Sequence, residues 1–213
     1  MILSPNRRLA FVHIPHTGGT SLETLWAESL ALPTDWVAMD GRAKHATALE
    51  IRGLLAPPDD AADWVLFTIH RNAWARIHSE FHHLRADYAK WKAGQILPHG
   101  EWADRMGTAA LLSFPAWVAV EWGNRHLSPW EHYATDWFAK PIVSHVLRFE
   151  RLAQDWAALC HFRGIVCPKP LPVINRVEHP PYQSEFDAAS REIVANVCRA
   201  EIERFGDVFG GPG

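Results

Sequence analysis

The chain has 213 residues, of which 48% are hydrophobic and 21% are charged, and its formal net charge is −3 with a pI near 6.5. This length and composition are typical of a globular protein, and they predict a single domain over residues 1–213. The slightly acidic charge excludes a general basic surface for nucleic acid, and no window approaches the roughly 18 apolar residues of a membrane span.

The three cysteines, Cys160, Cys167 and Cys198, are few and have no CxxC spacing. They predict neither a disulfide framework nor a zinc site, and reduced thiols are typical of a cytoplasmic protein. Nothing near the N-terminus resembles a signal peptide, because Arg7 and Arg8 are followed by only a short apolar strand. We therefore expect a cytoplasmic protein.

The predicted elements begin with an apolar strand at residues 9–14, which Pro15 ends. A helix follows Gly19 and carries Leu22 and Leu25 on one side. The next elements, in chain order, are a short strand at residues 34–39, a helix over residues 48–55 with His45 at or just before its start, a buried strand at residues 64–69, and a long helix with Asn72 as its N-cap.

Residues 89–107 contain Gly94, Pro98 and Gly100 and predict a surface loop or lid. The elements expected beyond it are a helix over residues 111–122 capped near Ser113, a strand at residues 142–149, a helix at residues 152–162, a proline-rich extended connector at residues 167–181, and a helix at residues 187–205 that Gly206 ends. Strands that alternate with helices predict an α/β fold with a central, largely parallel sheet flanked by helices.

The segment at residues 15–21 joins the first predicted strand to the first predicted helix. Gly18 and Gly19 allow backbone angles closed to other residues and let a ligand approach the main chain. The N–H groups and the dipole of a helix start favour an anion such as phosphate. An ordinary strand-to-helix turn is the alternative, since glycine pairs are common in such turns.

A second polar segment follows the buried strand at residues 64–69. Arg71 offers a forked set of donors for a phosphate, and Ser79, eight residues later, adds a hydroxyl on the following helix. Taken singly, each is as well explained by a solvated arginine or a helix-surface serine. Ligands of parallel sheets bind beyond the carboxyl ends of the strands, so residues 15–21 and 70–76 are expected to face one ligand.

Residues 11–22, FVHIPHTGGTSL, resemble the 5′-phosphosulfate-binding loop of sulfotransferases that use 3′-phosphoadenosine 5′-phosphosulfate (PAPS). The matching residues are Pro15, Thr17, Gly18, Gly19, Thr20 and Ser21. His16 stands where that family has a lysine, which holds the bridging oxygen as the sulfonate departs; a histidine can do so when it is protonated. Residues 65–79 resemble the family's 3′-phosphate-binding segment, with Arg71 and Ser79 matched and Ala73 in place of a proline.

The resemblance implies a P-loop-like sulfotransferase fold and transfer of a sulfuryl group from PAPS to a hydroxyl or amine of an acceptor, such as a carbohydrate. Its chemistry requires no metal, and the charge balance leads us to expect no nucleic-acid partner. The residues that the resemblance implies for the 5′-phosphosulfate are His16, Thr17, Gly18, Gly19, Thr20 and Ser21, and those for the 3′-phosphate are Arg71 and Ser79. Residues 175–176, with Tyr182, resemble a C-terminal stretch that packs near the nucleotide, which suggests Arg176 as a further ligand of the 3′-phosphate; an exposed arginine is the alternative. The alternative is a catalytically impaired protein that binds PAPS or its product, because His16 replaces the lysine.

The general base is expected to be His45, because residues 44–48 resemble the Lys/Gly-His segment that holds the base in bacterial and uronyl-type sulfotransferases. A neutral imidazole suits proton removal near pH 7. Glu23, just inside the first helix, competes for this role, and a helix-capping role for His45 is the structural alternative.

His78, His82 and His83 have the spacing of neighbours on one helix. Histidines at i and i+4 can share a zinc ion, but there is no HExxH pattern and no cysteine nearby. The pattern favours a polar helix face, and no metal is expected.

Overall fold

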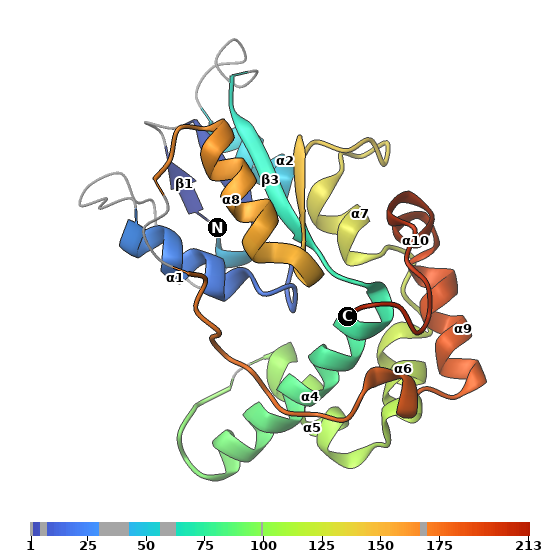
Figure 1. The fold of residues 1–213 in the computed structure, drawn as a ribbon. Coiled ribbons are helices and arrows are strands. Elements are labelled where there is room, and N and C mark those ends of the chain that lie inside the picture. Colours follow the sequence, from blue (N-terminus) through green and yellow to red (C-terminus); the bar gives the residue numbers. More distant parts are fainter. Residues whose placement is uncertain (1, 5–7, 30–42, 56–62, 99, 167–169) are drawn as a thin grey trace. The chain divides into compact units, whose positions relative to one another are not determined.

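The computed structural model describes residues 2–4, 8–29, 43–55, 63–98, 100–166 and 170–213. The strand expected at residues 34–39 and Cys167 lie outside the described residues. The chain forms two compact units (Figure 1): unit 1 comprises residues 1–71 and 129–175, and unit 2 comprises residues 72–128 and 176–213. That both belong to one domain stays a prediction.

Unit 1 is built on a sheet in which the described strands have the order β1-β2-β3-β4. These strands are β1 (Ile2–Ser4), β2 (Leu9–Val12), β3 (Val65–His70) and β4 (His145–Arg148). β1 is antiparallel to β2, whereas β2, β3 and β4 are parallel neighbours. The predicted α/β architecture with a largely parallel sheet is confirmed. Because Val12 pairs with Thr68, the segments that follow β2 and β3 leave the same edge of the sheet.

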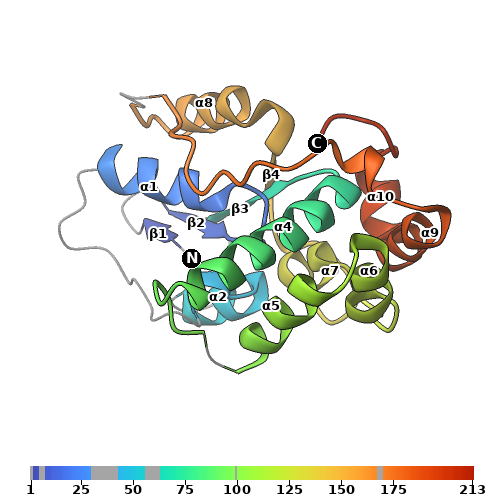
Figure 2. The same cartoon turned by 90° about the horizontal axis from the view of Figure 1, so that it is seen from below.

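Helices cover both faces of this sheet: α1 and α8 lie on one face, and α2 and α7 on the other (Figure 2). Their bounds are α1 (Gly19–Ser29), α2 (Ala48–Leu54), α7 (Pro129–Ala134) and α8 (Leu152–Phe162), with short 3-10 turns η2 (Ala43–His45) and η3 (Phe149–Arg151). Alternate residues of the strands face α1 and α8. Together with apolar side chains of these two helices they form a core of Leu9, Phe11, Leu22, Leu25, Phe67, Ile69, Leu147, Trp156 and Leu159.

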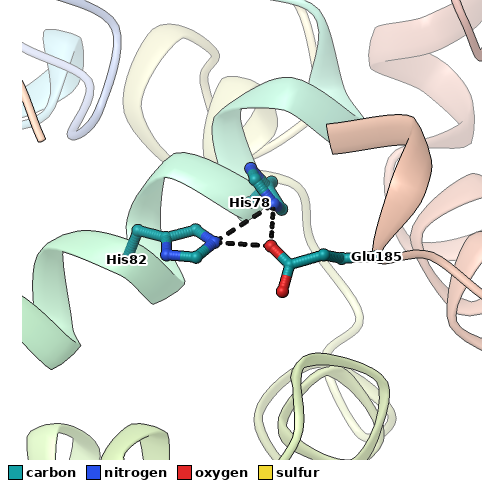
Figure 3. A group of neighbouring side chains, drawn as sticks. All are labelled: His78, His82 and Glu185. Carbon is teal, nitrogen blue, oxygen red and sulfur yellow. Dashed lines mark hydrogen bonds and ion pairs between the residues drawn. The ribbon is translucent and has the colours of Figure 1, made fainter. Parts of the chain in front are cut away.

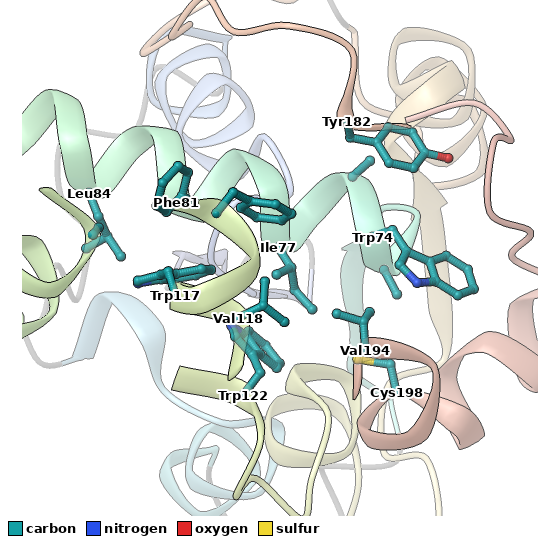
Figure 4. Packing of buried hydrophobic residues seen from close by; sticks show 14 of the residues in the cluster. Trp74, Ile77, Phe81, Leu84, Trp117, Val118, Trp122, Tyr182, Val194 and Cys198 are labelled. Carbon is teal, nitrogen blue, oxygen red and sulfur yellow. The ribbon is translucent and has the colours of Figure 1, made fainter. Parts of the chain in front are cut away.

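Unit 2 is helical in its described residues. It contains α4 (Ala73–Lys92), α5 (Glu101–Leu111), α6 (Phe114–Trp122), η4 (Tyr182–Ser184), α9 (Ala188–Val197) and α10 (Arg199–Phe205). Figure 4 shows Ile77 and Phe81 of α4 packed with Trp117 of α6 and with other buried residues. Asn72 is the N-cap of α4, as predicted, since its side-chain oxygen accepts from the Ala75 N–H at 3.3 Å.

Several predicted boundaries were wrong. The surface loop expected at residues 89–107 is narrower, because α4 continues to Lys92 and α5 begins at Glu101; a lid role for the rest stays a prediction. The sequence did not indicate α5, because Gly100 precedes it, Gly107 lies within it, and only Met106 and Ala109 of this helix are buried. The helix expected at residues 187–205 is divided at Cys198, whose backbone has φ −98° and ψ 19°. The helix expected over residues 111–122 begins at Phe114, with Ser113 as its N-cap as predicted. β1 and α7 were not predicted.

The described helices do not include one that combines the length and apolar character needed to cross a membrane.

Candidate functional site

The loop between β2 and α1 is fixed by its own hydrogen bonds. The hydroxyl of Thr17 donates to the carbonyl of Ile14 at 2.7 Å, and the Ser21 N–H donates to the carbonyl of Gly18 at 3.1 Å. His16 and Gly18 both have positive φ, 63° and 84°. The hydroxyl proton of Thr17 is therefore committed to the loop, and an anion at this helix start would meet backbone N–H groups and the hydroxyls of Thr20 and Ser21.

Packing explains why residues 18 and 19 are both glycine. A Cβ on Gly19 would lie 2.4 Å from the imidazole of His13, and one on Gly18 would lie 3.0 Å from the ring of Phe149. Gly18 also has a φ that side chains disfavour. The two glycines are thus needed for the loop to close against neighbouring rings.

We predict that Gly19→Ala lowers the free energy of unfolding by about 1–3 kcal/mol, because the added methyl group overpacks a site where His13 is buried. Urea unfolding measures this change. Gly53→Ala is the matched control: a Cβ there meets nothing within 4 Å, and alanine favours the helix interior, so the variant should gain up to about 1 kcal/mol. A Gly19→Ala protein as stable as the wild type would contradict the packing account.

His13, which packs against Gly19 of the loop, is joined to His45 by a hydrogen bond at its backbone carbonyl. Nδ1 of His13 lies 2.9 Å from Oε1 of Glu23, and Nδ1 of His45 lies 2.9 Å from the carbonyl oxygen of His13. A carbonyl oxygen only accepts, so Nδ1 of His45 carries the proton and its Nε2 carries a lone pair. His45 is therefore held in the tautomer that a general base requires.

The pKa values separate the two candidate bases. Burial lowers the pKa of His13 and brings that of His45 to about 4, so both imidazoles are neutral near pH 7. Burial alone would raise the pKa of Glu23, but the hydrogen bond from His13 and nearby positive charge outweigh it and hold that pKa at about 2. Glu23 is thus the weaker base and is already engaged by His13, so the geometry favours His45.

Lys44 brings an ammonium group to the start of α1. Its Nζ donates to Oγ1 of Thr20 at 3.3 Å and lies 3.6 Å from Oε2 of Glu23. The predicted site residues did not include Lys44, because it lies outside the loop motif and 24 residues beyond Thr20. Its place beside His45 was the only signal that could have suggested it.

Arg71, directly after β3, reaches the same loop. Its Nη1 donates to the carbonyl of His16 at 3.2 Å, and its guanidinium lies 4.2 Å from the ring centre of Phe149. The side chain is largely buried, with a residue exposure of 9%. The segments after β2 and β3 therefore meet at the sheet edge, as the parallel order predicts.

Ser21 links the loop to the proline-rich connector at residues 167–181. Its Oγ accepts from the backbone N–H of Ile174 at 3.2 Å, so it keeps a hydroxyl proton that can be donated elsewhere. Ser79 and Arg176 belong to unit 2, where Ser79 is buried on α4 and Arg176 is exposed. Their assignment to the 3′-phosphate stays a prediction.

The histidines of α4 do not form the polar surface that was expected. His78 is fully buried, and its Nε2 and that of His82 lie 2.6 and 2.7 Å from Oε2 of Glu185 (Figure 3). Burial lowers the pKa of His78 to about 4, although its hydrogen bond with Glu185 acts in the opposite direction. The spacing of the histidines could not reveal this, because the carboxylate is more than a hundred residues away in the sequence.

The chain matches no family model, no curated protein and no solved structure. The resemblance to sulfotransferases therefore depends on the motif residues alone.

Proposed function

We propose that this chain is a sulfotransferase that moves a sulfuryl group from PAPS to a hydroxyl or amine of an acceptor, such as a carbohydrate. The observation that supports this most is the contact between Arg71 and the carbonyl of His16. It joins the two motifs of the resemblance, which are 55 residues apart in sequence, at the edge of a parallel sheet where ligands bind.

The loop, Arg71 and His45 would each have a role in this reaction. The start of α1 at Gly19 and the hydroxyls of Thr20 and Ser21 would bind the 5′-phosphosulfate, and Arg71 would bind the 3′-phosphate. The acceptor oxygen attacks sulfur while the bond from sulfur to the bridging oxygen breaks, and that electron pair leaves with the phosphate. The acceptor proton goes to Nε2 of His45. This chemistry requires no metal.

Lys44 is proposed to replace the lysine that the loop lacks. Positive charge is needed where the bridging oxygen becomes negative, and Lys44 is an ammonium already at the start of α1. His16 accepts a hydrogen bond from Arg71 at its backbone carbonyl, and its imidazole would carry positive charge only when protonated. The positive charge that the family's lysine supplies at position 16 would then come from Lys44 in another segment.

The second candidate is a protein that binds PAPS or its product, 3′-phosphoadenosine 5′-phosphate (PAP), without transfer. The ion pair between Lys44 and Glu23 favours it, because a carboxylate offsets the charge that the reaction needs. This candidate shares the nucleotide site and differs only in turnover.

Sulfuryl transfer from radiolabelled PAPS to a panel of acceptors, between about pH 5.5 and 8, tests the proposal and separates the two candidates. We expect turnover by the wild type and a loss of roughly 10²–10³ in kcat for Lys44→Gln, the magnitude typical of one electrostatic donor. Lys140→Gln, at an exposed lysine of unit 1, is the control and should retain wild-type turnover. A wild type without turnover that gains it in His16→Lys would establish the binding protein instead.

A further inference from the structure

A second group of side chains, His78, His82 and Glu185, lies entirely within unit 2 (Figure 3). The two histidines are one turn apart on α4, so they project from the same side of the helix. Glu185 directly follows η4 and points its carboxylate between them. The three ligand atoms are mutually close: Nε2 of His78 and Nε2 of His82 are 3.2 Å apart, and Oε2 of Glu185 is 2.6 and 2.7 Å from them.

No placement of protons on the two Nε2 atoms gives every one of these three atoms a good hydrogen bond. If both Nε2 atoms are protonated, two N–H groups converge on one oxygen of Glu185 and crowd each other at 3.2 Å. If one is unprotonated, it faces the carboxylate at hydrogen-bond distance without a proton between them. Nδ1 of His78 is also buried and has no hydrogen-bond partner among the described residues, so this ring has its polar contacts only inside the group.

A single cation satisfies all three atoms. Ligands bound about 2.1 Å from a tetrahedral zinc ion lie roughly 3.4 Å from one another, which the present distances reach by small outward movements. Two imidazoles with one carboxylate suit zinc, whereas magnesium and calcium prefer oxygen ligands. Only the two histidines are visible as a spacing in the sequence, because the carboxylate comes from a distant segment.

The surrounding residues hold the group in place. The ring of Phe114 packs edge-on against His78 with centres 5.1 Å apart, and Phe186, next to Glu185, packs against Phe114 at 4.6 Å. His179 stacks on His82 at 5.1 Å. Nδ1 of His179 lies 3.0 Å from the carbonyl of Pro180, which fixes its proton there and leaves Nε2 with a lone pair.

We propose that His78, His82 and Glu185 bind one zinc ion, with the fourth coordination position beside His179. The ion would tie α4 to the segment at residues 179–185 within unit 2. The proposal is independent of the sulfotransferase reaction, which needs no metal, and it can fail or hold whether or not PAPS binds.

Calorimetric titration of the full chain, freed of metal by a chelator and dialysed, with zinc chloride tests the site. We expect one tight zinc ion per chain, and we expect His82→Ala and Glu185→Gln each to weaken its binding at least about 100-fold, more than loss of an outer-sphere partner does. His83→Ala removes the adjacent histidine of the same helix, outside the group, and should leave the affinity unchanged. His78 is not substituted, because its burial makes misfolding a competing cause of lost binding.

Far-ultraviolet circular dichroism checks that each variant is folded, and cobalt(II) serves as a second probe. The wild type should give the visible absorption of a four-coordinate cobalt site, and both ligand variants should lose it. Zinc affinity that is the same in His82→Ala, Glu185→Gln and the wild type would overturn the proposal, as would a wild type that binds no zinc.

Discussion

Arg71→Lys should bind PAP at least about 100-fold more weakly than the wild type does. The guanidinium is largely buried at the loop, where it donates to the carbonyl of His16. Loss of a buried, charge-assisted contact to a bound phosphate costs roughly 2–5 kcal/mol. Lysine keeps the charge but cannot reproduce the planar fork that also lies over Phe149. Isothermal titration calorimetry measures the change in affinity directly.

Arg52→Lys is the matched control, because Arg52 is exposed in the last turn of α2 and takes no part in the loop contacts described above. Its affinity for PAP should be within about twofold of the wild type, as expected for an exposed substitution. If Arg71→Lys binds PAP as tightly as Arg52→Lys does, Arg71 is not a phosphate ligand.

His45→Gln should lower kcat for sulfuryl transfer by roughly 10²–10⁴, the contribution typical of a positioned general base, while PAP affinity changes little. A protonated imidazole cannot accept a proton, so wild-type turnover should fall as the pH drops through the pKa of His45. That pKa is about 4 in the free protein, and bound phosphosulfate should raise it. The variant should lose this acidic limb of the pH profile, which steady-state kinetics at several pH values can measure.

Glu23→Gln distinguishes the rival base. Glu23 is expected to position His13 and Lys44, so the variant should lose less rate than His45→Gln and keep the acidic limb of the profile. Full turnover in His45→Gln, with its loss in Glu23→Gln, would reverse the assignment.

The sequence predicted the strands that bury apolar side chains, and it missed the elements without such a signal. β2 and β3 are apolar and contain β-branched or aromatic residues, whereas the apolar residues of β4 are only Val146 and Leu147; each strand was expected near its observed position. β1 is a three-residue strand at the edge of the described sheet, too short for a pattern. α5 was obscured by Gly100 at its start and Gly107 within it, which weaken helix propensity.

For the candidate site, too, the sequence predicted some residues and missed others. The loop at residues 15–21 and Arg71 could be predicted, because a parallel sheet brings the ends of neighbouring strands to one edge. The ammonium of Lys44 and the carboxylate of Glu185 were missed, because their contacts depend on how segments remote in sequence pack together. The burial of His78 was missed for the same reason, since the aromatic ring of Phe114 that packs against it lies on another helix.

The central claim is that the segments after β2 and β3 bind one adenosine that carries phosphates at both its 5′ and 3′ positions. Calorimetric titration of the wild type with PAP and, separately, with ATP and magnesium tests it most directly. We predict micromolar or tighter binding of PAP, and binding of ATP at least about tenfold weaker, a difference of about 1.4 kcal/mol. No heat with PAP, or tighter binding of ATP than of PAP, would contradict the account.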